Sequence, residues 1–321
     1  MEVFITGAAG YIGSTLCRLL LSDSYEVTGI DKLLFGGRSL LGLLQSNNFR
    51  FLRDDICNTA AYENLLDSRT TIVHLAAIVG EPASRNAPEE AIRTNVEATK
   101  RLINLAIQKK VEKFMFASTC SNYGKCGHEE LVTEECDLHP LSLYAETKVE
   151  IEKYLANEVK DRLNWTILRL ATVYGISPRL RFDLTVNDFT LHAIVDKKLT
   201  IFLPESSRPY VHVMDVAAAV QLVLNNMNST AQEVFNVGDT TENYKKIDIV
   251  NEIKKIVGDF DVELVEKGND LRDYKVGFEK IKGKLNYQTT RTVSDGIGEI
   301  AFLVKKKIIN DFANKEYYNC Y

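Results

Sequence analysis

Tyr144 and Lys148 stand four residues apart within a stretch, 142–159, whose pattern predicts a helix. Residues at this spacing project from one face of a helix. A phenol with a pKa of about 10 is a poor base at neutral pH, but a neighbouring cation favours the phenolate. Such a pair could then accept a proton from an alcohol while hydride leaves the same carbon. The same pair also occurs on the surface of ordinary amphipathic helices. The surrounding elements must therefore show whether this pair is catalytic.

Two hydroxyl residues, Ser118 and Thr119, follow a predicted strand at 113–117. In an open sheet of parallel strands, ligands bind at the carboxyl ends of the strands. A hydroxyl at this place could hydrogen-bond a reacting oxygen and relay its proton.

The chain begins with an apolar run at 3–5 and continues through Gly7, Gly10 and Gly13 into helical spacing of apolar residues. This order predicts a buried strand, a tight turn and a helix. Glycines let a diphosphate lie against bare backbone N–H groups at the positive end of the helix. The first gap is one residue wider than in the usual dinucleotide-binding pattern.

Asp31 comes directly after a second predicted strand, at 26–30. A carboxylate at this distance from the glycine turn is placed to bind the ribose hydroxyls of NAD. Its charge would repel the extra phosphate of NADP, so NAD is predicted, although the adjacent Lys32 leaves NADP open.

Strands and helices alternate through the first half of the chain, which predicts an α/β fold with a doubly wound parallel sheet. After residue 170 the alternation breaks down, and residues 171–210 are expected to form loops and short helices of a lid. We therefore expect a dinucleotide-binding domain at 1–170 and a smaller, mostly substrate-binding C-terminal lobe at 171–321. Later segments, such as a predicted strand at 233–237, can rejoin the first domain.

The composition narrows the class of protein. A net charge of −5 without a basic stripe argues against nucleic acid as a partner. The six cysteines form no Cys-x-x-Cys pair and the five histidines are scattered, so we expect free thiols in a reducing cytoplasm and no metal site. No signal peptide is expected, and no apolar run is long enough to predict a membrane span.

Together these motifs resemble the extended short-chain dehydrogenase/reductase family, specifically its nucleotide-sugar epimerases and dehydratases. The resemblance covers nearly the whole chain and implies a Rossmann fold. It is carried by Thr6-Gly-Ala-Ala-Gly-Tyr-Ile-Gly13, Asp31-Lys-Leu, Asp55-Ile56, His74-Leu-Ala-Ala77, Asn95, Ser118-Thr-Cys-Ser-Asn-Tyr-Gly124, Tyr144 to Lys148 and Arg208-Pro-Tyr-Val-His-Val-Met-Asp215.

The resemblance implies that Thr119, Tyr144 and Lys148 are the catalytic set and that NAD is the cofactor. It also implies that Asp55 and Ile56 contact adenine, and that Asn95 supports the site. The predicted cofactor-binding residues are Gly7, Gly10, Tyr11, Ile12, Gly13, Asp31, Lys32, Asp55, Ile56, Leu75, Ala76, Ala77, Asn95, Ser118, Tyr144 and Lys148.

The implied substrate is a nucleoside-diphosphate sugar whose phosphates match arginine side chains. The predicted substrate-binding residues are Thr119, Thr172, Arg181, Asn187, Arg208 and Arg272. Thr172 replaces an Asn that the epimerases often have, and Arg272 is only a candidate because the segment around it differs from theirs.

The resemblance leaves several reactions open. The 4,6-dehydratases carry Asp-Glu after the catalytic Thr, where this chain has Cys120 and Ser121, so a 4-epimerase working through a 4-keto intermediate is predicted. A net 4-dehydrogenase or 4-keto reductase would use the same residues, and the stretch 169–183 also looks like GDP-heptose 4-dehydrogenases. A noncatalytic dinucleotide-binding redox sensor is the alternative of another class. A homodimer is implied through the helices around 88–110 and 142–160.

Overall fold

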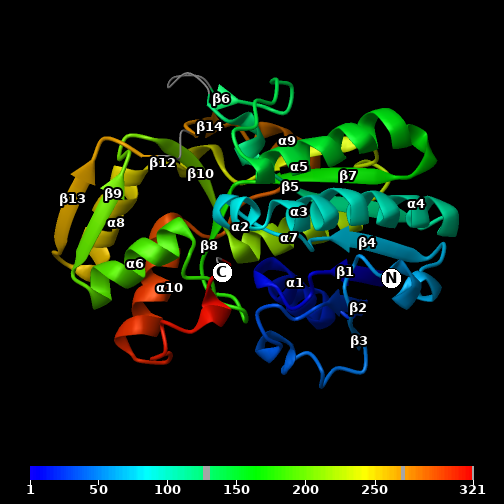
Figure 1. Ribbon diagram of the computed structural model, residues 1–321, viewed down its shortest axis with the longest axis horizontal. Coiled ribbons are helices and arrows are strands. Elements are labelled where there is room, and N and C mark those ends of the chain that lie inside the picture. The colour runs from blue at the N-terminus through cyan, green and yellow to red at the C-terminus, as the bar shows by residue number, and fades with distance from the viewer. Residues whose placement is uncertain (126–130, 269–271, 320–321) are drawn as a thin grey trace.

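A computed structural model describes residues 1–125, 131–268 and 272–319 of the chain (Figure 1). Seven strands form one parallel sheet. In order across the sheet they are β11 (Glu233–Val237), β7 (Trp165–Leu170), β5 (Lys113–Thr119), β4 (Thr70–His74), β1 (Glu2–Thr6), β2 (Glu26–Asp31) and β3 (Phe49–Arg53). The chain runs outward from β1 through β2 to β3 and then returns to β4 on the other side of β1. Such a switch in strand order leaves a crevice at the carboxyl ends of the strands. The predicted doubly wound parallel sheet is therefore confirmed.

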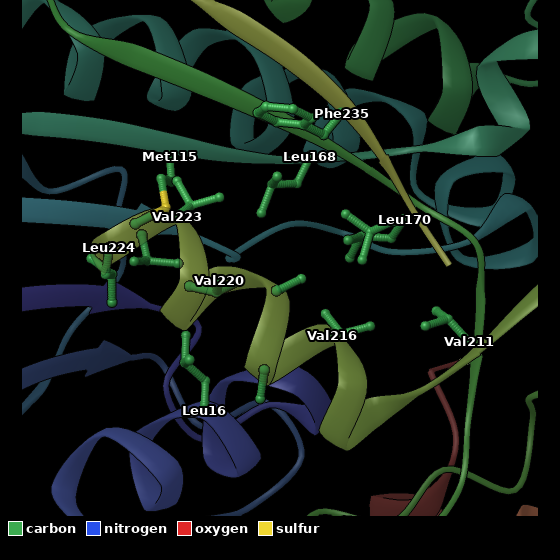
Figure 2. Packing of buried hydrophobic residues seen from close by; sticks show 14 of the residues in the cluster. Leu16, Met115, Leu168, Leu170, Val211, Val216, Val220, Val223, Leu224 and Phe235 are labelled. Carbon is green, nitrogen blue, oxygen red and sulfur yellow. The ribbon is translucent and has the colours of Figure 1, made fainter. Parts of the chain in front are cut away.

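Helices cover both faces of this sheet. Alternate residues of a strand point to opposite faces, so Val3 and Ile5 pack on one side and Phe4 on the other. The first face is covered by α1 (Tyr11–Ser22) and α7 (Val213–Asn225), whose Leu16 and Val220 belong to the buried cluster shown in Figure 2. The second face is covered by α4 (Thr99–Lys109) and α5 (Leu143–Lys153).

The helix predicted from 88 to 110 is divided. It consists of α3 (Pro88–Ile92), a π-helical segment at Arg93–Ala98, and α4. A second π-helical segment, Tyr154–Val159, follows α5. Short π segments interrupt helices frequently at functional sites. Between β4 and α3 lies α2 (Glu81–Asn86).

The rest of the chain forms a lobe beside the carboxyl edge of the sheet (Figure 1). Its core lies among α6 (Thr185–Val195), α8 (Lys246–Val257) and α10 (Val293–Lys305). One small sheet has the strand order β12 (Asn243–Lys245), β10 (Ser207–His212), β8 (Thr172–Tyr174). Two further sheets have two strands each: β13 (Asp261–Val265) with β9 (Lys198–Phe202), and β14 (Lys275–Val276) with β6 (Leu131–Val132). Helix α9 (Glu279–Leu285) packs near β11.

The prediction of loops and short helices over residues 171–210 is wrong for much of that stretch. It contains the 11-residue helix α6 and strands β8 and β9. The buried face of α6 includes the polar residues Asn187 and Thr190, which interrupt the apolar spacing on which the prediction depended.

Strand β11 and helix α7 come after residue 170 but belong to the large sheet and its cover. The division of the chain at residue 170 into two domains stays a prediction. Among the described residues, no helix has the length and apolar character needed to cross a bilayer.

Candidate active site

A pocket of about 410 Å³ lies between the carboxyl edge of the large sheet and the lobe. Nearly all the predicted site residues line it, although they come from segments far apart in the chain. They are Gly7, Gly10, Tyr11, Ile12, Gly13, Asp31, Lys32, Asp55, Ile56, Leu75, Ala76, Ala77, Ser118, Thr119, Tyr144, Lys148, Thr172, Arg181, Arg208 and Arg272. Asn95 and Asn187 do not line it and lie behind its wall.

The glycine turn between β1 and α1 gives the pocket a bare backbone floor. Gly7 has a φ of +74°, which L side chains rarely adopt, and a Cβ on Gly13 would overlap the Gly7 carbonyl oxygen. Helix α1 begins after Gly10 without a side-chain cap and without an acidic residue in its first turn. The N–H groups of that turn therefore fit an anionic diphosphate.

Asp31 closes the turn from the end of β2. Its Oδ2 accepts a hydrogen bond from the Ala9 N–H at 3.0 Å, and its Oδ1 accepts one from the Leu33 N–H at 2.8 Å. Burial raises the pKa of Asp31 although these hydrogen bonds oppose the rise. A carboxylate oxygen can accept more than one hydrogen bond, so Asp31 retains capacity for ribose hydroxyls.

Lys32 is engaged by carboxylates. Its Nζ lies 2.9 Å from Glu90 Oε1 and 3.5 Å from Asp55 Oδ2. Because acidic groups surround this lysine, it is poorly placed to bind the extra phosphate of NADP. The geometry at this end of the pocket favours NAD.

A buried hydrogen-bond chain holds the loop after β4 against the turn. Thr6 Oγ1 accepts hydrogen bonds from the N–H groups of Leu75 and Ala76, each at 3.1 Å, and bonds His74 Nδ1 at 2.7 Å. His74 Nε2 lies 2.9 Å from Thr99 Oγ1, and burial lowers the pKa of His74 to about 3. His74 is therefore a neutral structural link.

Asn95 fixes the next part of that loop. Its Oδ1 accepts a hydrogen bond from the Ile78 N–H at 2.8 Å, and its Nδ2 donates to the Ile78 carbonyl oxygen at 3.0 Å. Asn95 lies in the π-helical segment, so the extra residue in that turn sets where its side chain points.

Tyr144 and Lys148 reach the pocket from α5, which Ser142 caps by accepting a hydrogen bond from the Ala145 N–H at 3.2 Å. Lys148 Nζ donates to the Ala117 carbonyl oxygen at 2.8 Å and lies 5.8 Å from the centroid of the Tyr144 ring. This places the ammonium between the phenol and the end of β5.

Burial controls the protonation of this pair. It lowers the pKa of Lys148 to about 7, although the negative charge of Glu152 opposes this fall. It raises the pKa of Tyr144 to about 12, although the positive charges of Arg181 and Arg272 oppose this rise. In the protein alone the phenol is thus protonated at neutral pH. A phenolate at Tyr144 needs further positive charge in the pocket, which an oxidised nicotinamide carries.

The hydroxyls at the end of β5 point in different directions. Ser118 Oγ donates to the buried Glu152 carboxylate, whereas Thr119 Oγ1 lies 2.8 Å from Ser121 Oγ. Thr119 and Ser121 both line the pocket. Cys120 between them is buried and donates to the Arg169 carbonyl oxygen at 3.3 Å, and burial raises the pKa of its thiol.

Four arginines line the pocket, and three of them were predicted to bind substrate: Arg181, Arg208 and Arg272. Arg181 forms a two-pronged ion pair with Asp183, with nitrogen–oxygen distances of 2.7 and 3.0 Å. Arg208 donates to the Ser207 carbonyl oxygen at 2.7 Å. Arg272 is the third. Three cations that converge on one pocket match a ligand with two phosphate charges.

Asn187 positions this wall. It is fully buried, and its Nδ2 donates to the Arg181 carbonyl oxygen at 2.8 Å while its Oδ1 accepts from the Gly175 N–H at 3.0 Å. Its assignment as a direct substrate contact stays a prediction.

Other lining residues escaped the sequence reasoning. The sequence pointed to Arg179, because it stands two positions before Arg181 in a basic loop, but no sequence pattern pointed to the other residues of this group. They include Asp54, Glu81, Arg179, Lys246, Tyr274 and Asn319.

Among the described residues, no three His, Cys, Asp or Glu side chains lie close enough to hold a metal ion. Cys17, Cys57, Cys120 and Cys136 are free thiols, whereas Cys126 and Cys320 lie outside the described residues.

Known proteins resemble this chain in sequence and in fold. An uncharacterized UDP-glucose epimerase, YtcB, of Bacillus subtilis (strain 168) is 32% identical over 321 residues, with 94% of this chain and 98% of that protein covered. A dTDP-glucose 4,6-dehydratase of Streptomyces niveus is 28% identical, with 93% and 91% covered. The crystal structure of UDP-glucuronic acid 4-epimerase from Bacillus cereus, in complex with UDP-glucuronic acid and NAD, matches with a TM-score of 0.86 at 29% identity, covering 95% of this chain and 99% of that one.

The family model of the NAD dependent epimerase/dehydratase family matches residues 3–238, a span that includes the glycine turn, Asp31 and the Tyr144–Lys148 pair. The predictions of an enzyme and of NAD as its cofactor are thereby confirmed at the level of the family. With its parallel sheet, its bare glycine floor and this match, the chain belongs to the NAD dependent epimerase/dehydratase family.

Proposed function

We propose that this protein oxidises and re-reduces C4 of a nucleoside-diphosphate sugar, as an NAD-dependent 4-epimerase. One observation carries the proposal: Thr119, Tyr144 and Lys148 line the same pocket as the glycine turn and Asp31. A proton acceptor for a sugar hydroxyl therefore lies in the same space as the cradle for a dinucleotide.

The substrate class follows from the charges. Arg181, Arg208 and Arg272 line the pocket on the lobe side and suit the diphosphate of a nucleotide sugar. The relatives named as epimerases carry UDP-glucose or UDP-glucuronic acid in their names, and both compounds have the two phosphate charges that these arginines suit.

Bound NAD supplies the hydride acceptor. In the proposed mechanism Tyr144 takes the proton of the C4 hydroxyl, and Thr119 holds that oxygen by a hydrogen bond. Lys148, fixed to the Ala117 carbonyl oxygen, holds the nicotinamide ribose and stabilises the phenolate. An epimerase requires the 4-keto sugar to present its other face to the returning hydride, while Tyr144 gives the proton back to the C4 oxygen.

The residues after Thr119 favour epimerisation over dehydration. Cys120 is buried and absent from the lining, and Ser121 carries a hydroxyl with no acidic group. Elimination of water needs an acid and a base at these two places, and neither side chain is suited to that work.

The test is to incubate the purified protein with UDP-glucose and UDP-glucuronic acid, and with their GDP, dTDP and CDP counterparts, and to follow C4 configuration by NMR and NADH by absorbance. We expect a mixture of two C4 epimers from one of these substrates without net NADH. Release of NADH in proportion to substrate would instead identify a net 4-dehydrogenase.

We also propose a homodimer through the outer faces of α3, α4 and α5, and a place in the reducing cytoplasm. The four described free thiols are in keeping with that compartment. Light scattering on the purified protein tests the dimer: a mass of one chain, 36.2 kDa, would contradict it.

A further inference from the structure

The segment that follows α10 crosses from the lobe to the large sheet, and we call residues 312–319 the C-terminal strap. The Phe182 N–H donates to the Tyr317 carbonyl oxygen at 2.9 Å, and the Asn319 N–H donates to Asp183 Oδ2 at 3.2 Å. The Phe182 ring packs edge-on against Phe312, with centroids 5.8 Å apart. These contacts fix the strap to the lobe.

The strap also contacts the loop that follows β2. Glu316 Oε2 lies 3.7 Å from Arg38 Nε. A Cβ on Gly36 would come within 2.5 Å of Glu316 Oε1, so the Glu316 carboxylate rests directly on this loop. The strap therefore joins the two sides of the pocket, and in Figure 1 it lies on the side of α10 that faces α1.

Asn319 lies in the wall of the pocket. It lines the pocket and is only 7% exposed, and its Oδ1 has no hydrogen-bond partner among the residues that the structure describes. Burial of an amide oxygen without a hydrogen-bond partner is energetically unfavourable. A group of the bound ligand would satisfy it.

Arg179 indicates which part of the ligand lies there. Its guanidinium is buried, donates to the Tyr318 carbonyl oxygen at 3.5 Å, and lies 4.1 Å from the centroid of the Phe35 ring. Its charge also opposes the rise in the pKa of Asp31. Tyr318, and with it Asn319, is thus near the Asp31 end of the pocket, where the adenosine ribose and the diphosphate fit.

We propose that the C-terminal strap completes the cofactor site, because the Asn319 carboxamide hydrogen-bonds the adenosine ribose–diphosphate half of NAD and, with Arg179, encloses it between turnovers. This role requires only that the protein binds NAD, and it holds for any sugar or reaction. It places cofactor contacts in a segment outside residues 3–238, which the family model matches.

The test compares Asn319→Ala with Asn310→Ala, which removes the same amide from an exposed position ahead of the strap. Calorimetry gives the dissociation constants of NAD and ADP-ribose, and displacement by excess ligand gives the rate of NAD release. We expect Asn319→Ala to raise both dissociation constants and the release rate about tenfold, the effect of one lost hydrogen bond with its partner left unpaired. Asn310→Ala should match the wild type.

Equal affinity of Asn319→Ala and the wild type for NAD would overturn the proposal, as would weaker binding of NAD with unchanged binding of ADP-ribose. Hydrogen exchange of the wild-type protein gives a second measurement that needs no variant. Saturating ADP-ribose should slow exchange across residues 312–319, and unchanged exchange there would show that the strap does not enclose the cofactor. Neither measurement involves a sugar, so a failure of the proposed epimerase activity would leave both readable.

Discussion

The Arg169 guanidinium and the Glu152 carboxylate form a buried ion pair, with Arg169 Nη2 2.7 Å and Nε 3.1 Å from Glu152 Oε2. The pair joins β7 to α5, and neither residue lines the pocket. Glu152 also accepts hydrogen bonds from Ser118 and Asn122, and it follows Lys148 by one helical turn. One carboxylate thus supports both the end of β5 and the charge of Lys148.

Replacement of Glu152 by Gln should lower the free energy of unfolding by about 3 kcal/mol, because it leaves Arg169 buried without its counter-charge. The negative charge of Glu152 raises the pKa of Lys148, so its loss should lower that pKa further and move the alkaline limb of kcat/KM to lower pH. Urea unfolding and a pH–rate profile measure the two effects. Glu205→Gln is the matched control, because Glu205 pairs with Lys245 on the surface, away from α3, α4 and α5, and its loss should leave stability near the wild-type value. An unchanged profile in Glu152→Gln would separate Glu152 from Lys148.

Replacement of Tyr144 by Phe should leave NAD binding near the wild-type value and reduce turnover by about 10²- to 10⁴-fold, the usual contribution of a positioned acid/base. Calorimetry with NAD and a turnover assay on the same preparation provide the comparison. Tyr25→Phe, which removes a hydroxyl bonded to the exposed Asn225, should retain full turnover. Wild-type turnover in Tyr144→Phe would remove this phenol from the mechanism.

Replacement of Asp31 by Asn should weaken NAD binding and improve the relative binding of NADP. The amide keeps an oxygen for the Ala9 or Leu33 N–H but removes the charge that repels a phosphate on the ribose. The ratio of the two dissociation constants should shift toward NADP by about tenfold, equivalent to about 1.4 kcal/mol. An unaltered ratio would mean that the neighbouring Asp55 and Glu90, and not Asp31, set the preference.

His74 should make stability fall in acid. Its pKa is about 3 in the folded protein and about 6.5 in the unfolded chain, so the unfolded chain binds more protons between these values. Stability should therefore decrease as the pH falls through 6.5, by about 2 kcal/mol at pH 5 from this residue. His74→Gln should flatten that slope in urea unfolding between pH 7 and pH 5, whatever its effect at pH 7. An equally steep slope would assign the acid sensitivity to other groups.

Several elements follow from the chemistry of neighbouring residues and are predictable from the amino-acid sequence. Continuous apolar residues at 3–5 predict a strand that is buried on both faces, and Gly7 and Gly13 stand where a side chain would be strained or would overlap the backbone. Asp31 ends β2 as predicted, and Tyr144 and Lys148 share one helix and one pocket. Each of these patterns spans few residues, so periodicity and steric rules suffice to find it.

Other features depend on contacts between residues that are far apart in the chain. Asn187 carries a polar side chain on a buried helix face because it bonds backbone groups of distant turns, and such partners are invisible to local periodicity. Arg179 and Asn319 are 140 positions apart, yet they line one wall, because the strap returns along the loop at 179–183. The protonation of Tyr144 and Lys148 likewise depends on burial, which is set by the packing of segments from the whole chain.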